Sequence, residues 1–341
     1  MPLTNLRPLG LALMLPFVAM TGQPAAAQEE PRFYTMATAD EGGTYYPVGV
    51  AMAVLAKISL ESLYGIDMEA VVSGGSIDNI RMMREGEAQF GILQVLAAEW
   101  ARDGTGPLAE VDPSDSVRAV SMLWPDVAHF LLRSDLVETG TLEDLANLEG
   151  QGFSMGPANS STEYTNVMLF DVLELSYQDW NPVNESYSDS VQSLPEGRIA
   201  GVNIGAGVGV EAVSLLLATM GEGLELLTVT DAQAEHIEES LGSVSRVSIV
   251  GGTYAGVEDV RQTIALPNFL AVNADVSAED VYLITRTLFE NLEYLCEVHQ
   301  AACGLSVETA TEGLPVDLHP GAARYFRELA EASDDAEAAS E

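Results

Sequence analysis

The sequence predicts an α/β fold with mainly parallel sheets, and three observations support this prediction. Short apolar segments of strand type alternate with helical segments of about 10 to 15 residues, which is typical of parallel strands joined by helices. Hydrophobic residues make up 47% of the 341-residue chain, enough for a sizeable core. Several of the expected strands also end in small polar residues, and a helix begins directly after them.

The expected strands are short runs rich in apolar residues. They are FYTMAT (33–38), DMEAVVSG (67–74), AQFGILQ (88–94), VRAVSML (117–123), AHFLLRSD (128–135), GQGFSMG (150–156), 180–184, RIAGVNIG (198–205), LELLTV (224–229) and TIALPNFLAVN (263–273). The expected helices are 47–60, 76–85, 96–102, 162–175, 189–194, 209–220, 232–241 and 278–295. In the first of them, Val48, Met52 and Leu55 recur at the spacing of one helical face.

The chain is strongly acidic, with 52 aspartate and glutamate residues against 14 lysine and arginine residues and a net charge of -38. A surface with this charge repels nucleic acid and anionic lipid, so we expect neither as a partner. A solvated acidic surface, as in a salty habitat, accounts for the charge. A dedicated cationic partner is the alternative.

Residues 1–27 have the pattern of a signal peptide. Arg7 is their only charged residue, and the apolar run at 9–20 is too short to span a bilayer comfortably. Ala25 and Ala27 match the small residues that precede a cleavage site. We therefore expect export to the periplasm, cleavage after Ala27, and no membrane insertion of the mature chain.

The chain has two cysteines, Cys296 and Cys303. An even number of cysteines in an exported protein is typical of disulfide pairing, so we expect a bridge that closes a short loop. Two reduced thiols remain the alternative.

Three other features could suggest catalysis or cofactor binding, but their context does not support it. Ser154 lies in a G-x-S-x-G pattern, yet the motif itself resembles a strand instead of a strand-to-helix turn. Val210 stands where a dinucleotide-binding loop needs its third glycine. The four histidines have no metal-binding spacing. We expect no catalytic residues, no cofactor and no metal.

A repeated design remains, at three places where a strand ends and a helix begins: EGGTYYP (41–47), SGGSIDN (73–79) and GPANSSTEYTN (156–166). A helix N-terminus carries free N–H groups and a partial positive charge, so it can bind an anion without a basic side chain. Each junction alone is also explained by helix capping. Three of them in one exported α/β chain favour a carboxylate pocket at the carboxyl ends of the strands.

These segments, with GGTYAG (251–256) and SAEDVYLITRTLFEN (277–291), resemble the TAXI family of extracytoplasmic solute receptors of TRAP transporters. The resemblance implies a type II periplasmic-binding-protein fold, in which two α/β lobes joined by a hinge close on a small carboxylate such as glutamate or a dicarboxylate. It also implies docking on TRAP membrane subunits that import the solute with an ion gradient. Val95 and Leu96 depart from the family pattern after Gln94, as do Ser161 and the pair Ala200 and Gly201 in later motifs.

From the junctions and the resemblance we expect ligand-binding residues in both lobes. They are Gly43, Thr44, Tyr45, Tyr46, Gly75, Ser76, Asn79, Gln94, Ser160, Ser161, Thr162, Asn203 and Tyr254. The expected boundaries are 28–132 with 264–328 for lobe 1, 133–263 for lobe 2, and 329–341 for a disordered acidic tail. A periplasmic sensor that presents its solute to a signalling receptor is the alternative function, and an exported serine hydrolase is a further one. The sequence leaves the solute, its affinity, the coupling ion and the oligomeric state open.

Overall fold

Ten strands form one mixed sheet in the computed structural model, which describes residues 31–109 and 116–338. The strands are β1 (Arg32–Ala37), β2 (Ile66–Val71), β3 (Phe90–Gln94), β4 (Val117–Arg133), β5 (Gly152–Ser154), β6 (Asn181–Val183), β7 (Gly201–Ala206), β8 (Leu224–Leu226), β9 (Ser245–Ile249) and β10 (Arg261–Asn273). The α-helices are α1 (Tyr45–Tyr64), α2 (Ser76–Glu85), α3 (Val95–Asp103), α4 (Ser161–Val172), α5 (Tyr187–Ser193), α6 (Glu211–Met220), α7 (Asp231–Leu241), α8 (Ala278–Phe289), α9 (Leu292–Val298) and α10 (Pro320–Ala338). The expected signal peptide, 1–27, lies outside the described residues.

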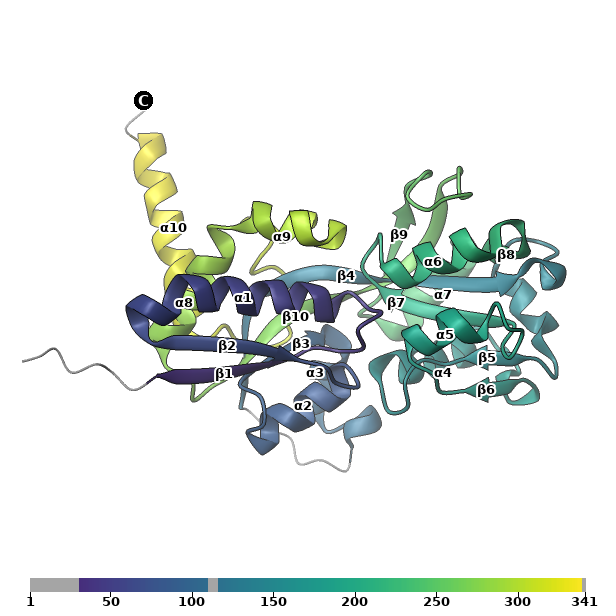
Figure 1. Cartoon of the computed structure of the whole chain (residues 1–341), viewed down its shortest axis with the longest axis horizontal. Helices are drawn as coiled ribbons and strands as arrows, with labels where there is room; N and C mark the ends of the chain where they lie inside the picture. Colours follow the sequence, from purple (N-terminus) through teal and green to yellow (C-terminus); the bar gives the residue numbers. More distant parts are fainter. Residues whose placement is uncertain (1–30, 110–115, 339–341) are drawn as a thin grey trace, which may run out of the picture. The chain divides into compact units, whose positions relative to one another are not determined.

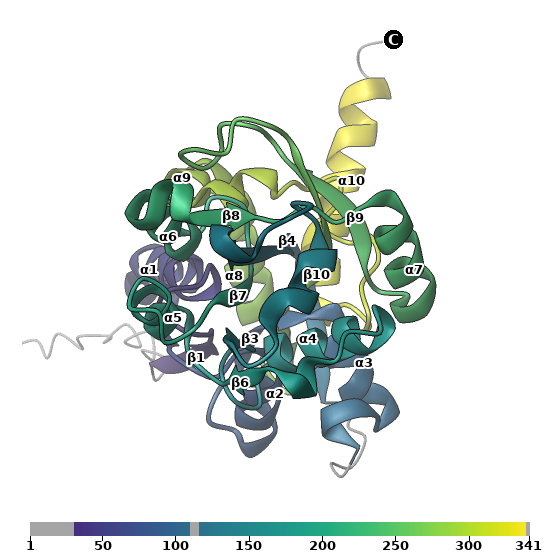
Figure 2. The ribbon, with the colours of Figure 1, turned by 90° about the vertical axis from the view of Figure 1, so that its right-hand side faces the viewer.

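The strand order is β2-β1-β3-β10-β4-β7-β5-β6, with β8 paired to β4 and β9 paired to β10. The pairs β1–β2 and β1–β3 are parallel, as are β5–β6 and β5–β7. β10 runs antiparallel to β3 and β4, and β4 runs antiparallel to β7. The expectation of a mainly parallel sheet is therefore wrong for the central strands. Helices cover both faces, with α6 and α7 on opposite sides of β4 and β10 (Figure 2).

β4 is one continuous strand, although the sequence predicts two strands separated near Pro125. Pro125 is paired in register with Pro267 of β10, so each proline faces a residue that also lacks an N–H group. The ladder passes through this point and becomes irregular just after it, between Pro267 and Phe269. β4 and β10 lie side by side from Val117 to Val127 (Figure 1). Beyond the prolines, from Val127 to Leu132, β4 pairs with β7.

α1 is long and apolar enough to cross a membrane by length and composition, and it is the one such helix among the described residues. Its buried face packs into the core through residues such as Val48, Met52 and Leu60, which are at most 3% exposed. Glycine at position 49 permits this close packing, because a Cβ atom there would lie 2.5 Å from the side chain of Thr38. Burial of this kind is what a core helix of an α/β fold requires.

The C-terminal region differs from the expectation in two respects. The expected helix at 278–295 is divided into α8 and α9 at Asn291, whose φ of -132° lies outside the helical range. Residues 329–338 were expected to be a disordered tail, but they continue α10, whose aromatic side chains pack on α8: Phe326 lies 5.0 Å from Phe289 between ring centroids. Figure 1 shows α10 extending from the fold beyond α8.

A disulfide bond joins Cys296, near the end of α9, to Cys303. The bond closes the turn that carries Ala301, with seven residues of sequence separation. This is the pairing that the sequence predicts.

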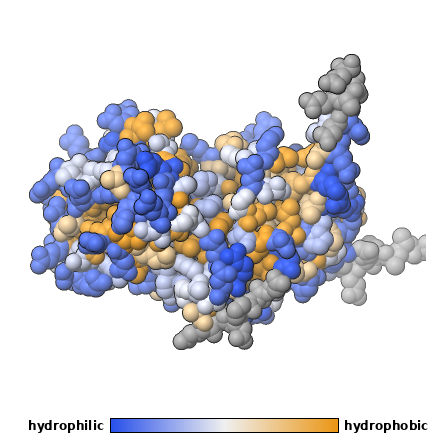
Figure 3. All heavy atoms as spheres, turned by 180° about the vertical axis from the view of Figure 1, so that it is seen from behind, coloured by the Kyte–Doolittle hydropathy of each residue, from blue (hydrophilic) through white to orange (hydrophobic). Residues whose placement is uncertain are grey.

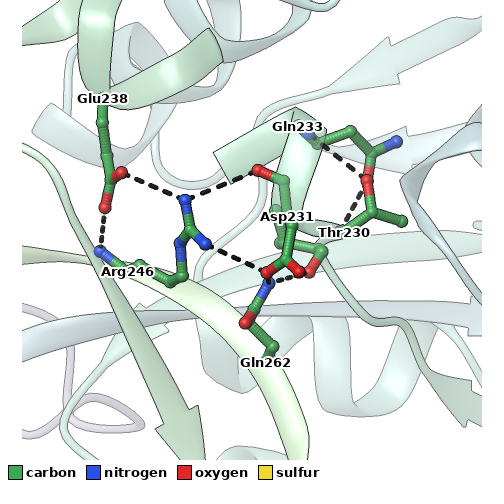
Figure 4. A network of polar contacts seen from close by, with 7 residues as sticks. Thr230, Asp231, Gln233, Glu238, Arg246 and Gln262 are labelled. Carbon is green, nitrogen blue, oxygen red and sulfur yellow. Dashed lines mark hydrogen bonds and ion pairs between the residues drawn. The ribbon is translucent and has the colours of Figure 1, made fainter. Parts of the chain in front are cut away.

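The acidic surface is partly neutralised by a small number of arginines. Figure 3 shows hydrophilic residues spread over one face of the molecule, with apolar residues between them. Around Arg246, the guanidinium lies 3.0 Å from an Asp231 carboxylate oxygen and 3.4 Å from one of Glu238 (Figure 4). Thr230 and Gln233 form a capping box at the start of the same helix, α7. Exposed pairs of this kind stabilise a fold by about 0–1 kcal/mol each.

Candidate functional site

The three strand-to-helix junctions meet at one cavity of about 30 Å³, which we call the junction pocket. Its lining residues are Ala39, Asp40, Gly43, Thr44, Tyr45, Gly74, Gly75, Asp126, Pro157, Ser160, Ser161, Thr162, Tyr187 and Gly205. The N-termini of α1, α2 and α4 all contribute to this lining. Seven of the thirteen residues that the sequence predicts are among them: Gly43, Thr44, Tyr45, Gly75, Ser160, Ser161 and Thr162.

At the first junction, the side chain of Thr44 does not cap α1, so capping does not explain this threonine. Its hydroxyl oxygen instead accepts a hydrogen bond from the Gly207 N–H at 3.0 Å. A Cβ atom on Gly207 would lie 2.3 Å from the Cβ of Ala301, so only glycine allows this approach. Gly42 is similarly constrained by Ser188. Tyr46 is half-buried and lies outside the lining.

At the second junction, Gly74 and Gly75 line the pocket and the polar residues behind them support it. Gly75 adopts a φ of 94°, which favours glycine. Ser76 and Asn79 were expected to bind the ligand, but they lie outside the lining. The Ser76 hydroxyl accepts a hydrogen bond from the Gln94 N–H at 2.9 Å. The Asn79 amide donates to the carbonyl oxygens of Thr38 and Ile92, so it ties β1 to β3.

At the third junction, the hydroxyl groups of Ser160 and Thr162 have different roles. The Ser160 hydroxyl caps α4 by accepting from the Glu163 N–H at 3.2 Å. The Thr162 hydroxyl lies 2.8 Å from the hydroxyl of Tyr187, which in turn donates to the Gly205 carbonyl at 3.0 Å. Burial raises the pKa of Tyr187 well above its usual range, so it stays protonated. Tyr187 is a lining residue that the sequence reasoning missed.

Asp126 is the most informative residue that the sequence reasoning missed. It is 3% exposed, and burial raises the pKa of its carboxyl group to about 7, although Gln94, Asn268 and Tyr45 stabilise its charge. The Gln94 amide donates to Oδ2 at 3.2 Å, while Oδ1 has no hydrogen-bond partner among the described residues. A single carboxylate within a long apolar strand was the signal available in the sequence.

Two further predicted residues support the pocket from outside it. Asn203 donates to Asn166 at 2.6 Å. Tyr254 lies between His129, 2.8 Å away, and the N–H group of Gly209, from which it accepts at 2.9 Å. Burial lowers the pKa of His129 to about 4, so its ring is neutral and accepts from the Tyr254 hydroxyl. Tyr254 thus holds the turn that presents Gly207 to Thr44.

The lining has two carboxylates, Asp40 and Asp126, and its described residues include no lysine, arginine or histidine. Within the described lining, the three helix N-termini are therefore the groups that carry partial positive charge. The Asp40 carboxylate accepts from the Gly42 N–H at 3.0 Å and from Ser188. Within residues 31–109 and 116–338, no cluster of three or more metal-ligating side chains was found. Ser154 is a β5 residue whose hydroxyl bonds to that of Ser190.

Comparison with known proteins gives the same fold. The profile of the NMT1-like family matches residues 36–329. The periplasmic binding protein BugD is similar in structure, with a TM-score of 0.53 and 12% identity over 90% of this chain and 98% of that one. A structure described as a periplasmic transporter has a TM-score of 0.50 and 10% identity, over 91% and 95% of the two chains. The chain therefore has the α/β fold of two-lobed periplasmic binding proteins.

Proposed function

We propose that this chain, which belongs to the NMT1-like family, is an exported solute-binding protein that captures a small carboxylate-bearing solute in the junction pocket. The observation that carries the proposal is the convergence of three helix N-termini on one cavity. Such termini offer unpaired N–H groups and a partial positive charge, and they bind carboxylates without a basic side chain. Binding requires no reaction, so we propose no catalytic role for the pocket.

The small volume of the pocket implies that the two sides separate before a solute enters. A volume of about 30 Å³ holds about two water molecules. Direct contacts join the sides, including the bond between Thr44 and Gly207 and the bond between Asp40 and Ser188. We propose that lobe 1 comprises 28–132 with 264–328 and lobe 2 comprises 133–263. Solute binding would then replace some of these direct contacts during closure.

The membrane partner that we propose is a TRAP transporter of the TAXI subfamily, on the strength of the sequence motifs at the junctions. A periplasmic sensor would use the same pocket and a different membrane protein. Reconstitution separates these functions: together with the membrane subunits of a TRAP transporter, the mature protein should drive ion-dependent uptake of its solute into vesicles. Solute binding without uptake would favour the sensor.

The pocket itself is tested by calorimetric titration after a thermal-shift screen of carboxylates and amino acids. Thr44→Ala and Thr162→Ala should each weaken solute binding by about ten- to a hundredfold, because each removes a lining hydroxyl that we propose contacts the charged carboxylate of the solute. Thr309→Ala is the control, since its exposed side chain bonds only to Ser306 in the structure. If both pocket variants bind as the parent does while their melting temperatures fall, these threonines serve stability alone.

A further inference from the structure

Asp126 lines the junction pocket and carries a buried, unpaired acceptor. Its Oδ1 atom is buried and has no hydrogen-bond partner among the described residues, while Oδ2 is bound by the Gln94 amide. Asp126 belongs to the lining, so a solute in the pocket can reach it. A buried carboxylate oxygen without a donor is costly, and a solute that supplies a donor removes this cost.

The protein's own donors near Asp126 are neutral groups. The Asn268 side chain stabilises the charged carboxylate, although its amide nitrogen has no hydrogen-bond partner within bonding distance among the described residues. The Tyr45 hydroxyl donates to the side-chain oxygen of Asn268 at 2.6 Å. The Gln94 amide is bonded to the other carboxylate oxygen. The described lining offers no lysine or arginine that could pair with the charge. The protein therefore offers the ionised carboxylate only neutral donors among the described lining residues and their neighbours, and a cationic donor would come from the solute.

The opposite charge preference is built into the same pocket. The N-termini of α1 and α4 contribute Thr44, Tyr45, Ser161 and Thr162 to the lining, and they favour a negative group. α4 has Glu163 in its first turn, but α1 has no acidic residue there, so no side chain of its own first turn neutralises the partial positive charge of α1. One small cavity thus combines an anion-binding region with a buried carboxylate. This combination matches a solute that carries both charges.

Building on the proposed solute-binding function, we infer that Asp126 accepts a hydrogen bond from a protonated amino group of the solute. The pocket then selects zwitterionic amino acids over carboxylates that lack the amino group. Asp126 determines this specificity, because its buried Oδ1 has no donor among the described residues, whereas the Asp40 carboxylate already accepts from Gly42 and Ser188. Removing the amino group from the solute leaves Oδ1 without a donor, and sites built around such a bond reject the analogue that lacks it.

The titratable groups around the pocket predict how solute affinity changes with pH. Asp126 itself is ionised above about pH 7. Tyr45 of α1 and Tyr187 of α5 have pKa values that burial raises well above their usual range, so both stay neutral. Asp40 is the other carboxyl group in the lining. An ammonium group binds the ionised form of Asp126, so affinity should rise as the pH increases from 6 to 8.

The test is a titration of the mature protein with matched pairs of solutes that differ only in the amino group. Glutamate is paired with glutarate, leucine with 4-methylpentanoate and glutamine with glutaramate. For the pair whose side chain fits, the amino acid should bind at least tenfold more tightly than its partner. Its affinity should rise from pH 6 to pH 8 by up to about tenfold.

Asp126→Asn supplies the second arm. It should weaken binding of the amino acid by about ten- to a hundredfold, leave the deaminated partner unaffected, and abolish the pH dependence. Asp280→Asn is the matched control, because Asp280 is equally buried but bonds to Tyr34 and Arg32 outside the pocket. Should Asp126→Asn fail to fold, the matched pairs and the pH series on the parent protein still test whether the pocket selects the amino group.

Two results would overturn the inference while the proposed function stands. One is a deaminated acid that binds as tightly as its amino acid. The other is an affinity that falls as the pH rises, which indicates a protonated Asp126 donating to a solute carboxylate. If neither member of any pair binds at any pH, the inference and the proposed carboxylate function are both wrong.

Discussion

Asp126 and His129 lie three residues apart on β4, and burial shifts their pKa values in opposite directions. The pKa of Asp126 is raised to about 7, and that of His129 is lowered to about 4. Each residue is neutral in the folded protein over a pH range where the unfolded chain carries the charge. Between about pH 4 and 7, both groups therefore favour unfolding. As the pH rises through this range, Asp126 lowers the free energy of unfolding and His129 raises it.

The sign for Asp126 leads to a prediction about stability. In the unfolded chain it ionises near pH 4, and in the folded protein near pH 7. Its stability contribution is present below about pH 4 and is lost as the pH rises through 7. Asp126→Asn should therefore become progressively more stable than the parent between pH 5 and pH 8, by roughly 4 kcal/mol at most. Chemical denaturation of both proteins without solute, at several pH values, measures this difference. An unchanging difference would mean that the carboxyl group titrates normally.

A second residue-scale prediction concerns the contact between Gly207 and Ala301. A Cβ atom at position 207 would lie 2.3 Å from the Cβ of Ala301, so Gly207→Ala overpacks the contact. Overpacking typically costs about 1–3 kcal/mol. The melting temperature should fall, and solute affinity should fall with it if this contact forms on closure. Gly223→Ala is the control, because a Cβ atom at position 223 has no neighbour within 4 Å. Equal melting curves for both variants would contradict the prediction.

At the scale of elements, local sequence patterns predicted the strand-to-helix junctions, but they did not predict how the central strands pair. The composition of the junctions indicated a pocket, and Thr44, Gly75 and Thr162 do line one cavity. Asp126 was not predicted as a site residue, because the sequence does not show which distant residues surround a carboxylate inside an apolar strand. The continuity of β4 was also missed, since Pro125 indicates a strand end unless its partner in register is known to be Pro267.

The paired prolines also suggest where the lobes bend. Pro125 and Pro267 face each other beside the irregular step of the ladder, and β4 changes partner from β10 to β7 beyond them. Asp126 and Asn268 follow the prolines directly, so the irregular step of the ladder lies next to the buried polar cluster of Asp126, Asn268, Tyr45 and Gln94. We propose that the hinge lies here, a few residues from the expected boundaries at Leu132 and Ile264.

The disulfide at the end of α9 makes a prediction at the same scale. Unreduced, denatured protein should contain no free thiol, because Cys296 and Cys303 are joined. Closing a loop of this length constrains the unfolded chain by roughly 2–3 kcal/mol in the entropic account. The double variant Cys296→Ser, Cys303→Ser should therefore lower the free energy of unfolding by about that amount. Two free thiols in the unreduced parent protein would show that Cys296 and Cys303 are not joined.

At the scale of the whole molecule, the acidic charge should make stability depend on salt. The chain carries a net charge of -38, and its arginines neutralise only part of the carboxylate population in exposed pairs such as Arg246 with Asp231. Repulsion among the remaining carboxylates destabilises the compact state. Salt screens this repulsion, with a Debye length of about 10 Å at 0.1 M and about 3 Å at 1 M.

We therefore expect the melting temperature to rise from low salt to molar sodium chloride. Screening also weakens the favourable pairs, but each contributes only about 0–1 kcal/mol, so net repulsion decides the sign. Potassium chloride should act as sodium chloride does, because screening depends on ionic strength and not on the cation. Choline chloride at equal ionic strength separates screening from specific cation binding. If it raises the melting temperature as much as sodium chloride does, screening is the cause. A flat or falling melting temperature would show that self-repulsion does not limit the stability of this fold.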